Sequence, residues 1–390
     1  MTTLEFGAWA ALRPVIIEER HGGVAAEAYD ADIREARLLD ELGYQYYWII
    51  EHQASYVGAI TTPSVFLAAV ARETERIRIG AMIWVLPFHN PVQLAEEVAM
   101  LDHLSHGRVE FGTGIGMAEH EFIRMGLDFY QRREMGEEAL EIIERAWTLP
   151  EVTYDGRFWK FNEMLPRPLP YQKPHPPIWI AAHSLRAFEW AAEQNYDVAS
   201  NVSTDDEMVE KFTHYRKVWA ECEYPGPMPR QMLVRPVHIA ETDAKAREEA
   251  ERYLMESMRL GREMVVDTRV GVGTHPRGKG KENNRYSRAN ARIFAQSRNS
   301  YDFWIDEGLA LIGSPETVAR QIAEKQERIG FTVFVANHRI GMMPADLVER
   351  SIRLFAEEVF PAFERPTEPV VPQSLAAERL ERIAQIKPVP

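Results

Sequence analysis

The sequence contains one cysteine, Cys222, among 390 residues. A single cysteine forms neither an internal disulfide nor a cysteine-based metal site, so disulfide-scaffold proteins are excluded and a reducing compartment, the cytoplasm, is expected. Positive charge is also in deficit, since 45 Lys and Arg oppose 59 Asp and Glu and the formal net charge is −14. This balance repels phosphate backbones, so nucleic acid is not an expected partner.

Long apolar runs are missing as well. No run approaches the length of about 18 residues that a membrane-spanning helix needs. The first ten residues, MTTLEFGAWA, lack a basic segment and are interrupted by Glu5, which does not fit a secretion signal. We therefore expect no membrane anchor. With 45% apolar and 27% charged residues, the composition is instead that of a globular protein with a sizeable core.

Short β-branched and aromatic runs alternate with longer segments of helical periodicity, a pattern that predicts parallel strands joined by crossover helices. In one such helix, Leu94, Val98 and Leu101 follow an i, i+4, i+7 stripe. Eight strands are predicted, at 4–8, 45–50, 77–85, 109–112, 178–181, 197–200, 232–240 and 331–336. Eight alternations favour the α/β class and a closed (β/α)8 TIM barrel with insertions; an open doubly wound sheet is the alternative.

Helix boundaries are clearest near the C-terminus. Ser314 is suited to cap a helix that begins at Pro315, and Gly330 is suited to end it. The last barrel helix carries an apolar face and ends before Pro361, a residue that commonly follows a helix.

Two segments interrupt the alternation. Asp155-Gly156 between aromatic flanks predicts a hairpin, and six prolines in 166–177 complete a rigid connector at 150–177. The segment at about 261–304 is basic, polar and too long for a simple connection, so it is either a lid or a passive surface insertion. We expect one barrel domain over 1–363, followed by a C-terminal tail at 364–390.

Candidate functional residues follow the predicted strands, because the active site of a closed barrel lies at the carboxyl ends of its strands. His52 can exchange a proton near neutral pH, although a structural histidine gives the same pattern. His183 and Ser184 begin a helix, where they suit either anion binding or simple capping. Asn201 follows the sixth strand.

Several catalytic motifs are missing. Gly112, Gly114 and Gly116 have neither the G-x-G-x-x-G spacing of a dinucleotide fold nor the Lys-Ser/Thr of a P-loop, so they indicate a tight turn or close approach to a flat ligand. No H-E-x-x-H or G-x-S-x-G is present, and no metal site is predicted.

Taken together, the local runs resemble the bacterial luciferase-like flavin-dependent monooxygenases, which are (β/α)8 barrels. The resemblance covers most of residues 1–200 and 310–363, and its most characteristic part is the second of the matching runs. These are LLDELGYQYYWIIEHQ, RIRIGAMIWVLPFHNPVQLAEEVAMLDHLSHGRVEFGTGIG, PHPPIWIAAHS with FEWAAEQ, and GSPETVARQIAEKQERIGF with LFAEEVFPAF.

The resemblance implies a two-component enzyme that takes reduced FMN from a separate flavin reductase and transfers one oxygen atom from O2 to a small, largely apolar substrate. It also implies a homodimer or higher homo-oligomer. Such chemistry needs an apolar pocket that excludes water. The aromatic residues expected to form its walls are Phe6, Trp9, Trp48, Trp84 and Phe88.

Three residues match family positions near the flavin ring. His52 matches the proton-handling histidine of the family's E-H motif. Met82 matches the residue before a non-prolyl cis peptide, shared with Ile83, that lies against the ring. Asn201 matches a ring-contacting position.

Other matches concern the flavin phosphate. His183 and Ser184 match the start of the helix that receives it. Gly114 and Ile115 stand where luciferase itself has a reactive cysteine and a phosphate-binding arginine, so light emission from an aldehyde is not expected. Because His183 replaces an acidic residue, we expect His183 or Arg186 to supply part of the missing positive charge.

Two other functions remain open on the same fold. One is a deazaflavin-dependent hydride-transfer oxidoreductase, because related barrels use that cofactor without oxygen. The other is a catalytically silent flavin-binding protein.

Overall fold

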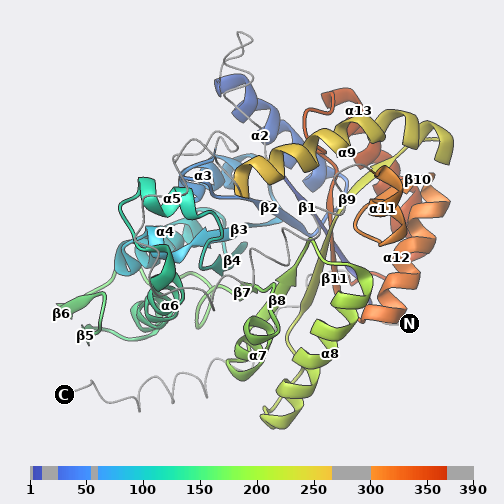
Figure 1. The fold of residues 1–390 in the computed structure, drawn as a ribbon. Helices are drawn as coiled ribbons and strands as arrows, with labels where there is room; N and C mark the ends of the chain where they lie inside the picture. Colours follow the sequence, from blue (N-terminus) through green and yellow to red (C-terminus); the bar gives the residue numbers. More distant parts are fainter. Residues whose placement is uncertain (1–2, 11–24, 54–59, 266–299, 367–390) are drawn as a thin grey trace.

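Eight parallel strands close into a barrel in the computed structural model, which describes residues 3–10, 25–53, 60–265 and 300–366 (Figure 1). Around the ring the order is β1, β2, β3, β4, β7, β8, β9 and β11, and β11 pairs with β1. Their bounds are Glu5–Trp9, Tyr46–Ile49, Arg78–Val85, Val109–Gly114, Ile178–Ala181, Asp197–Ser200, Gln231–Ile239 and Val333–Asn337. These are the eight predicted strands, so the (β/α)8 barrel is confirmed and the open sheet is wrong.

Helices surround the barrel and cover the outer faces of its strands (Figure 1). The main ones are α2 (Ala25–Glu41), α3 (Pro63–Glu73), α4 (Pro91–Leu104), α6 (Arg132–Thr148), α7 (Leu185–Glu193), α8 (Asp205–Glu221), α9 (Asp243–Val265), α12 (Pro315–Ile329) and α13 (Ala345–Leu354). Two short helices, α5 (Glu119–Arg124) and α11 (Tyr301–Asp306), lie in the longer connections.

The predicted boundaries of α12 are confirmed. The Ser314 hydroxyl accepts a hydrogen bond from the backbone N–H of Thr317 at 3.3 Å, and Pro315 occupies the first turn. Gly330 ends the helix in the left-handed conformation, with φ of 82°. After α13 the chain continues through a π-helical turn, Phe355–Val359, and then a 3-10 turn that ends at Ala362.

The predicted hairpin is also confirmed, as the antiparallel pair β5 (Val152–Asp155) and β6 (Lys160–Met164), which projects from the barrel in Figure 1. One strand was not predicted: β10 (Leu311–Gly313) pairs in parallel with the carboxyl end of β9. Of the predicted insertion at 261–304, the end of α9 and the start of α11 are described, and 266–299 lies outside the described residues. Residues 367–390 of the predicted tail also lie outside the described residues. The predicted boundaries of the barrel domain and the tail therefore stay predictions.

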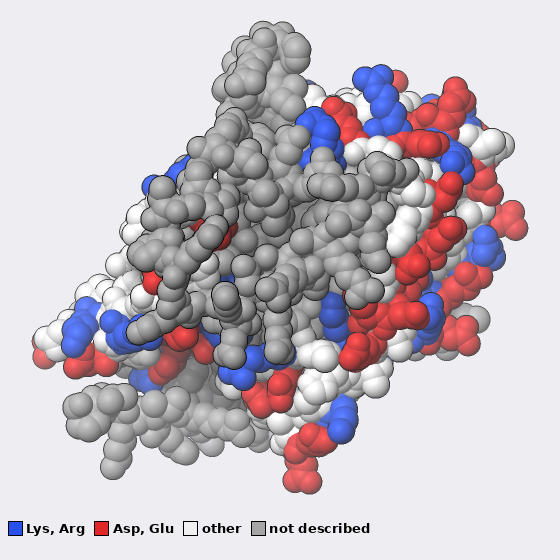
Figure 2. Space-filling model, viewed as in Figure 1, with Lys and Arg blue, Asp and Glu red and all other residues white. Residues whose placement is uncertain are grey.

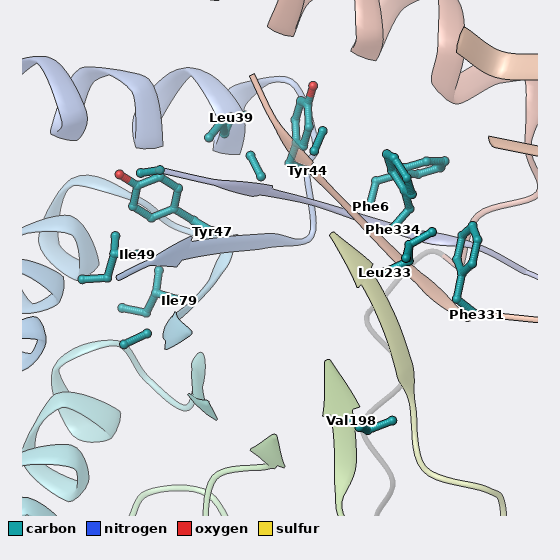
Figure 3. Close-up of a cluster of buried hydrophobic side chains, with 14 of the residues drawn as sticks. Phe6, Leu39, Tyr44, Tyr47, Ile49, Ile79, Val198, Leu233, Phe331 and Phe334 are labelled. Atoms are coloured by element: carbon teal, nitrogen blue, oxygen red, sulfur yellow. The ribbon is translucent and has the colours of Figure 1, made fainter. Parts of the chain in front are cut away.

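The core has two parts because side chains alternate along each strand. One part lies between strands and helices, and Figure 3 shows how α2 and the strands contribute to it. Labelled there are Phe6, Leu39, Tyr44, Tyr47, Ile49, Ile79, Val198, Leu233, Phe331 and Phe334. The other part fills the barrel interior, with Tyr46, Trp48, Trp179, Met232 and Val335 among its members.

The amino-terminal end of the barrel is closed by a buried ion cluster. Glu110 accepts hydrogen bonds from Arg230 at 2.9 Å and from the Trp179 indole at 2.6 Å, and it also pairs with Arg78. Arg230 bonds Asp197 at 2.7 Å. Burial raises the pKa of Glu110, but the two guanidinium groups outweigh burial and hold it below its usual value. This cluster ties β3, β4, β7, β8 and the start of β9 together.

Acidic side chains form a band on the right of the face shown in Figure 2, with basic ones scattered among them. On that face the described residues form no continuous basic surface, in keeping with the net charge of −14. Within the described ranges, no helix is both long and apolar enough to cross a membrane.

Candidate active site

A cavity of about 620 Å³ opens at the carboxyl ends of the barrel strands. The structure brings all five predicted site residues to its wall, although they are widely separated in the sequence. They are His52, Met82, His183, Ser184 and Asn201. The cavity volume lies within the range of about 300–1,000 Å³ typical of cofactor and ligand sites.

The predicted aromatic walls are only partly right. Trp9 and Trp48 line the cavity, whereas Phe6, Trp84 and Phe88 do not. Phe6 and Trp84 point outward, into the layer between strands and helices. Phe88 lies in the 3-10 turn after β3, and its ring packs on that of another phenylalanine, with the two ring centroids 4.7 Å apart. Strand alternation sends neighbouring residues to opposite faces, and aromatic character alone does not reveal which face is chosen.

His52 is held by a carboxylate from a distant part of the chain. Its Nδ1 lies 2.8 Å from Oε1 of Glu121, which α5 supplies from the connection after β4. Both side chains are largely buried, with 12% and 3% of their surface exposed. A carboxylate accepts, so Nδ1 carries the proton and Nε2 is the ring nitrogen available to a bound molecule. Sequence reasoning missed Glu121.

Glu51, the neighbour of His52, forms a bracket between two strand ends. Its carboxylate accepts from the backbone N–H of Val85 at 2.7 Å, from His89 at 2.9 Å and from Gln53 at 2.8 Å. Burial lowers the pKa of His89, but the bond and charge of Glu51 outweigh burial and raise it overall. This bracket fixes the turn that carries His52.

The peptide bond between Met82 and Ile83 is cis, as predicted, and both residues line the cavity. The neighbouring glycines are explained by the fold. A Cβ on Gly112 would lie 2.2 Å from the carbonyl oxygen of Ala81, so this position needs glycine for strand packing. Gly116 turns the chain with a φ of 74°.

The start of α7 shows the expected capping. The Ser184 hydroxyl accepts from the backbone N–H of Ala187 at 3.3 Å. Burial, reinforced by the positive charge of Lys211, lowers the pKa of His183 to about 3. His183 is therefore neutral at pH 7, so of the two residues expected to supply positive charge, His183 or Arg186, the structure leaves Arg186. Arg186 is an exposed residue of α7 and also lines the cavity.

Two further cationic side chains, Arg132 and Arg133, line the cavity from the first turn of α6. Sequence reasoning missed them. A signal was present, because arginines at a helix amino terminus oppose the helix dipole and suggest that something other than helix stability requires them.

The described residues fit a flavin mononucleotide. Arg132, Arg133 and Arg186 supply positive charge for a phosphate. Deeper in the cavity, Oγ1 of Thr113 and Oδ1 of Asn201 are buried without a hydrogen-bond partner among the described residues. Such atoms are rare unless a ligand or water pairs with them, which suits the polar edge of a flavin ring.

The profile of the luciferase-like monooxygenase family matches residues 15–332, and the chain belongs to that family. The predicted resemblance is confirmed. The chain is 27% identical over 321 residues to the oxygenase component of a flavin-dependent trigonelline monooxygenase from Acinetobacter baylyi, covering 76% of this chain and 89% of the relative. It is 27% identical over 341 residues to limonene 1,2-monooxygenase from Rhodococcus erythropolis, covering 86% and 82%.

Solved structures share the fold. The oxygenating constituent of 3,6-diketocamphane monooxygenase from Pseudomonas putida, in complex with FMN, superposes with a TM-score of 0.73 at 22% identity, covering 94% of this chain and all of that one. A coenzyme F420 dependent tetrahydromethanopterin reductase from Methanopyrus kandleri superposes with a TM-score of 0.65 at 20% identity, covering 93% and 99%.

Proposed function

We propose that the protein is the oxygenase component of a two-component flavin-dependent monooxygenase. It takes reduced FMN from a separate flavin reductase and transfers one oxygen atom from O2 to a small, largely apolar substrate. The observation that carries this proposal is the joining, in one cavity, of the His52–Glu121 pair with the arginines and the start of α7. Relatives named as flavin-dependent and limonene monooxygenases support it.

Different residues of the cavity would bind different parts of the cofactor. Arg132, Arg133 and Arg186, with the first turn of α7, would hold the phosphate of FMN. Met82 and Asn201 would lie against the ring. When bound, reduced FMN supplies the electrons that activate O2.

Water exclusion and proton transfer fall to other groups. The apolar wall of the cavity, which includes Trp48, Val234 and Val335, keeps water from the reacting atoms. His52 Nε2 exchanges a proton with substrate or cofactor, and Glu121 stabilises the imidazolium that forms when the ring is protonated.

A hydride-transfer oxidoreductase that uses a deazaflavin is the second candidate. The shared fold of the coenzyme F420 dependent reductase favours it, because a barrel of this shape accommodates either cofactor. The same cavity and the same His52 would then serve a reaction that needs no oxygen.

A cofactor test separates the two candidates. We expect reduced FMN, 18O2 and a panel of terpenes, ketones and aromatic compounds to yield a product that carries one 18O atom by mass spectrometry. A sample without protein measures the reaction of free reduced flavin with oxygen. Turnover under nitrogen with a reduced deazaflavin, and none with FMN and air, would establish the alternative.

We also propose that the protein works in the cytoplasm as a homodimer or higher homo-oligomer. Helices α3 and α4 pack beside each other and expose large apolar side chains. Val65 of α3 is 72% exposed, and Met100 and Leu104 of α4 are 54% and 37% exposed. Apolar surface gathered in this way is typical of an interface between subunits.

The oligomer has its own test. The double variant Val65→Glu with Met100→Glu is expected to convert a dimer into a monomer, measured by light scattering after size-exclusion chromatography. Ile123→Glu, which changes an exposed side chain of α5, serves as the control and should leave the mass unchanged. A wild-type monomer, or a double variant of unchanged mass, would contradict the proposal.

A further inference from the structure

Three polar side chains of the cavity wall lie at one level of the barrel, on the adjacent strands β11, β1 and β2. Trp9 is in register with Trp48. Asn337 lies one residue beyond the pair formed by Ala336 and Ala8, and so next to Trp9. All three line the cavity, and we refer to them as the Trp9–Trp48–Asn337 cluster.

Each member contributes a buried atom that has no hydrogen-bond partner among the described residues. These atoms are Nε1 of Trp9, Nε1 of Trp48 and Oδ1 of Asn337. Trp48 is 1% exposed and Asn337 is 7% exposed, and Trp9 is half-buried with its indole nitrogen itself buried, so bulk water does not satisfy the three atoms. Buried polar groups are almost always paired in folded proteins, so three unpaired ones at one level of a cavity point to a ligand.

The packing of Trp48 fixes the direction of its N–H. The six-membered ring lies against β3 and β4, because a Cβ built on Gly80 would meet Cζ3 of Trp48 at 2.6 Å and one on Gly112 would meet it at 3.1 Å. Nε1 is on the opposite edge of the indole. It therefore faces away from β3 and β4, and the other neighbour of β2 in the ring is β1, which carries Trp9.

The cluster lies on a different arc of the ring from the residues assigned to the flavin. Met82, His183 and Asn201 belong to β3 and to the ends of β7 and β8, whereas the cluster belongs to β11, β1 and β2. Beside the cluster the wall is apolar, with Val234 and Val335. This arc suits the substrate rather than the cofactor.

We propose that the Trp9–Trp48–Asn337 cluster binds a hydroxyl group of an otherwise apolar substrate, an alcohol or a phenol. A hydroxyl oxygen accepts from both indole N–H groups and donates its proton to Oδ1 of Asn337, which satisfies all three atoms. A carbonyl oxygen satisfies the two donors and leaves Oδ1 facing a lone pair. A hydrocarbon satisfies none of them. The inference names a substrate class for the proposed function and rests on it.

Three probes of one carbon skeleton test the proposal: menthol, menthone and p-menthane. Binding to the flavin-free protein is followed by tryptophan fluorescence and calorimetry, so the result does not depend on turnover. We expect menthol to bind at least tenfold more tightly than p-menthane, and more tightly than menthone, because a site built around a hydroxyl discriminates against analogues that lack it. Trp9→Phe keeps an aromatic ring without the N–H, and Asn337→Leu keeps the side-chain volume without the amide. In both variants the preference for menthol over p-menthane should fall to about twofold or less.

A parallel titration with reduced FMN under nitrogen distinguishes this proposal from the proposed function. We expect both variants to bind FMN as the wild type does. Equal binding of menthol and p-menthane by the wild type, tighter binding of menthone than menthol, or a preference that persists in both variants would overturn the proposal. Loss of FMN binding in the variants would also overturn it, by assigning the cluster to the cofactor. A wild type that prefers menthol and binds no reduced FMN would leave the hydroxyl site standing and overturn the proposed function alone.

Discussion

Replacing His52 with alanine is expected to lower the yield of oxygenated product by a factor on the order of 100 or more, the usual contribution of a general acid or base. Binding of reduced FMN should be retained, because the groups that would hold the phosphate lie on α6 and α7. The measurement is product formed per O2 consumed, with hydrogen peroxide measured in the same samples. We expect oxygen consumption to continue and peroxide to replace product.

Glu121 provides the matched control for this prediction. Glu121→Gln keeps a side chain that accepts a hydrogen bond from Nδ1 of His52 but removes the charge that stabilises an imidazolium. We expect its product yield to lie between those of the wild type and His52→Ala, and Glu121→Ala to fall close to His52→Ala. An unchanged ratio of product to oxygen in His52→Ala would contradict the role assigned to the histidine.

Removal of Arg230 is expected to destabilise the fold by about 3–5 kcal/mol, the usual cost of leaving buried charges without their partner. In Arg230→Ala, the carboxylates of Glu110 and Asp197 would face each other inside the barrel with only Arg78 to neutralise them. Urea denaturation followed by tryptophan fluorescence measures the change in the free energy of unfolding.

Arg328→Ala is the control for Arg230. Arg328 pairs with Asp206 on the surface, where the two side chains are 54% and 82% exposed. Exposed ion pairs contribute about 1 kcal/mol or less, so this variant should stay close to the wild type. If both arginine variants lost a similar free energy of unfolding, the buried cluster would contribute no more to the stability of the barrel than an exposed ion pair does.

The ring of eight strands could be predicted from the sequence because each strand is a compact apolar run between recognisable helices. Strand β10, which lies outside this ring, could not be predicted. β10 has three residues, Leu311–Gly313, directly before the capping residue of α12, and three residues are too few to show alternation. Its strand character comes from pairing with the end of β9, which is a tertiary effect.

The candidate site was predictable where a residue follows a strand and carries recognisable chemistry. His52 and Ser184 are of this kind. Glu121 is not, since it stands 69 residues from His52 on a helix of six residues whose place is set only by packing.

The aromatic wall shows a second limit. Phe6 and Trp9 are three residues apart on one strand, so their side chains point to opposite faces of it. The alternation of side chains along a strand therefore excludes placing both residues in the cavity wall. Trp84 follows an interruption in the pairing of β3 with β4, where the register shifts after Ala81. Beyond this shift, the simple alternation of side chains no longer predicts which face a residue points to.

The proposed proton-transfer pair and two of the three proposed substrate contacts are carried by separate stretches of chain, whereas the third contact, Trp48, lies on β2 close to His52. The His52–Glu121 pair joins the end of β2 to α5, whereas Trp9 and Asn337 belong to the first and last strands of the ring. Mutational drift or directed evolution can therefore diversify the compounds accepted by one lineage through β1 and β11 while selection preserves the acid–base pair. Laboratory libraries aimed at new products would concentrate their diversity at these two neighbouring strands and keep α5 constant.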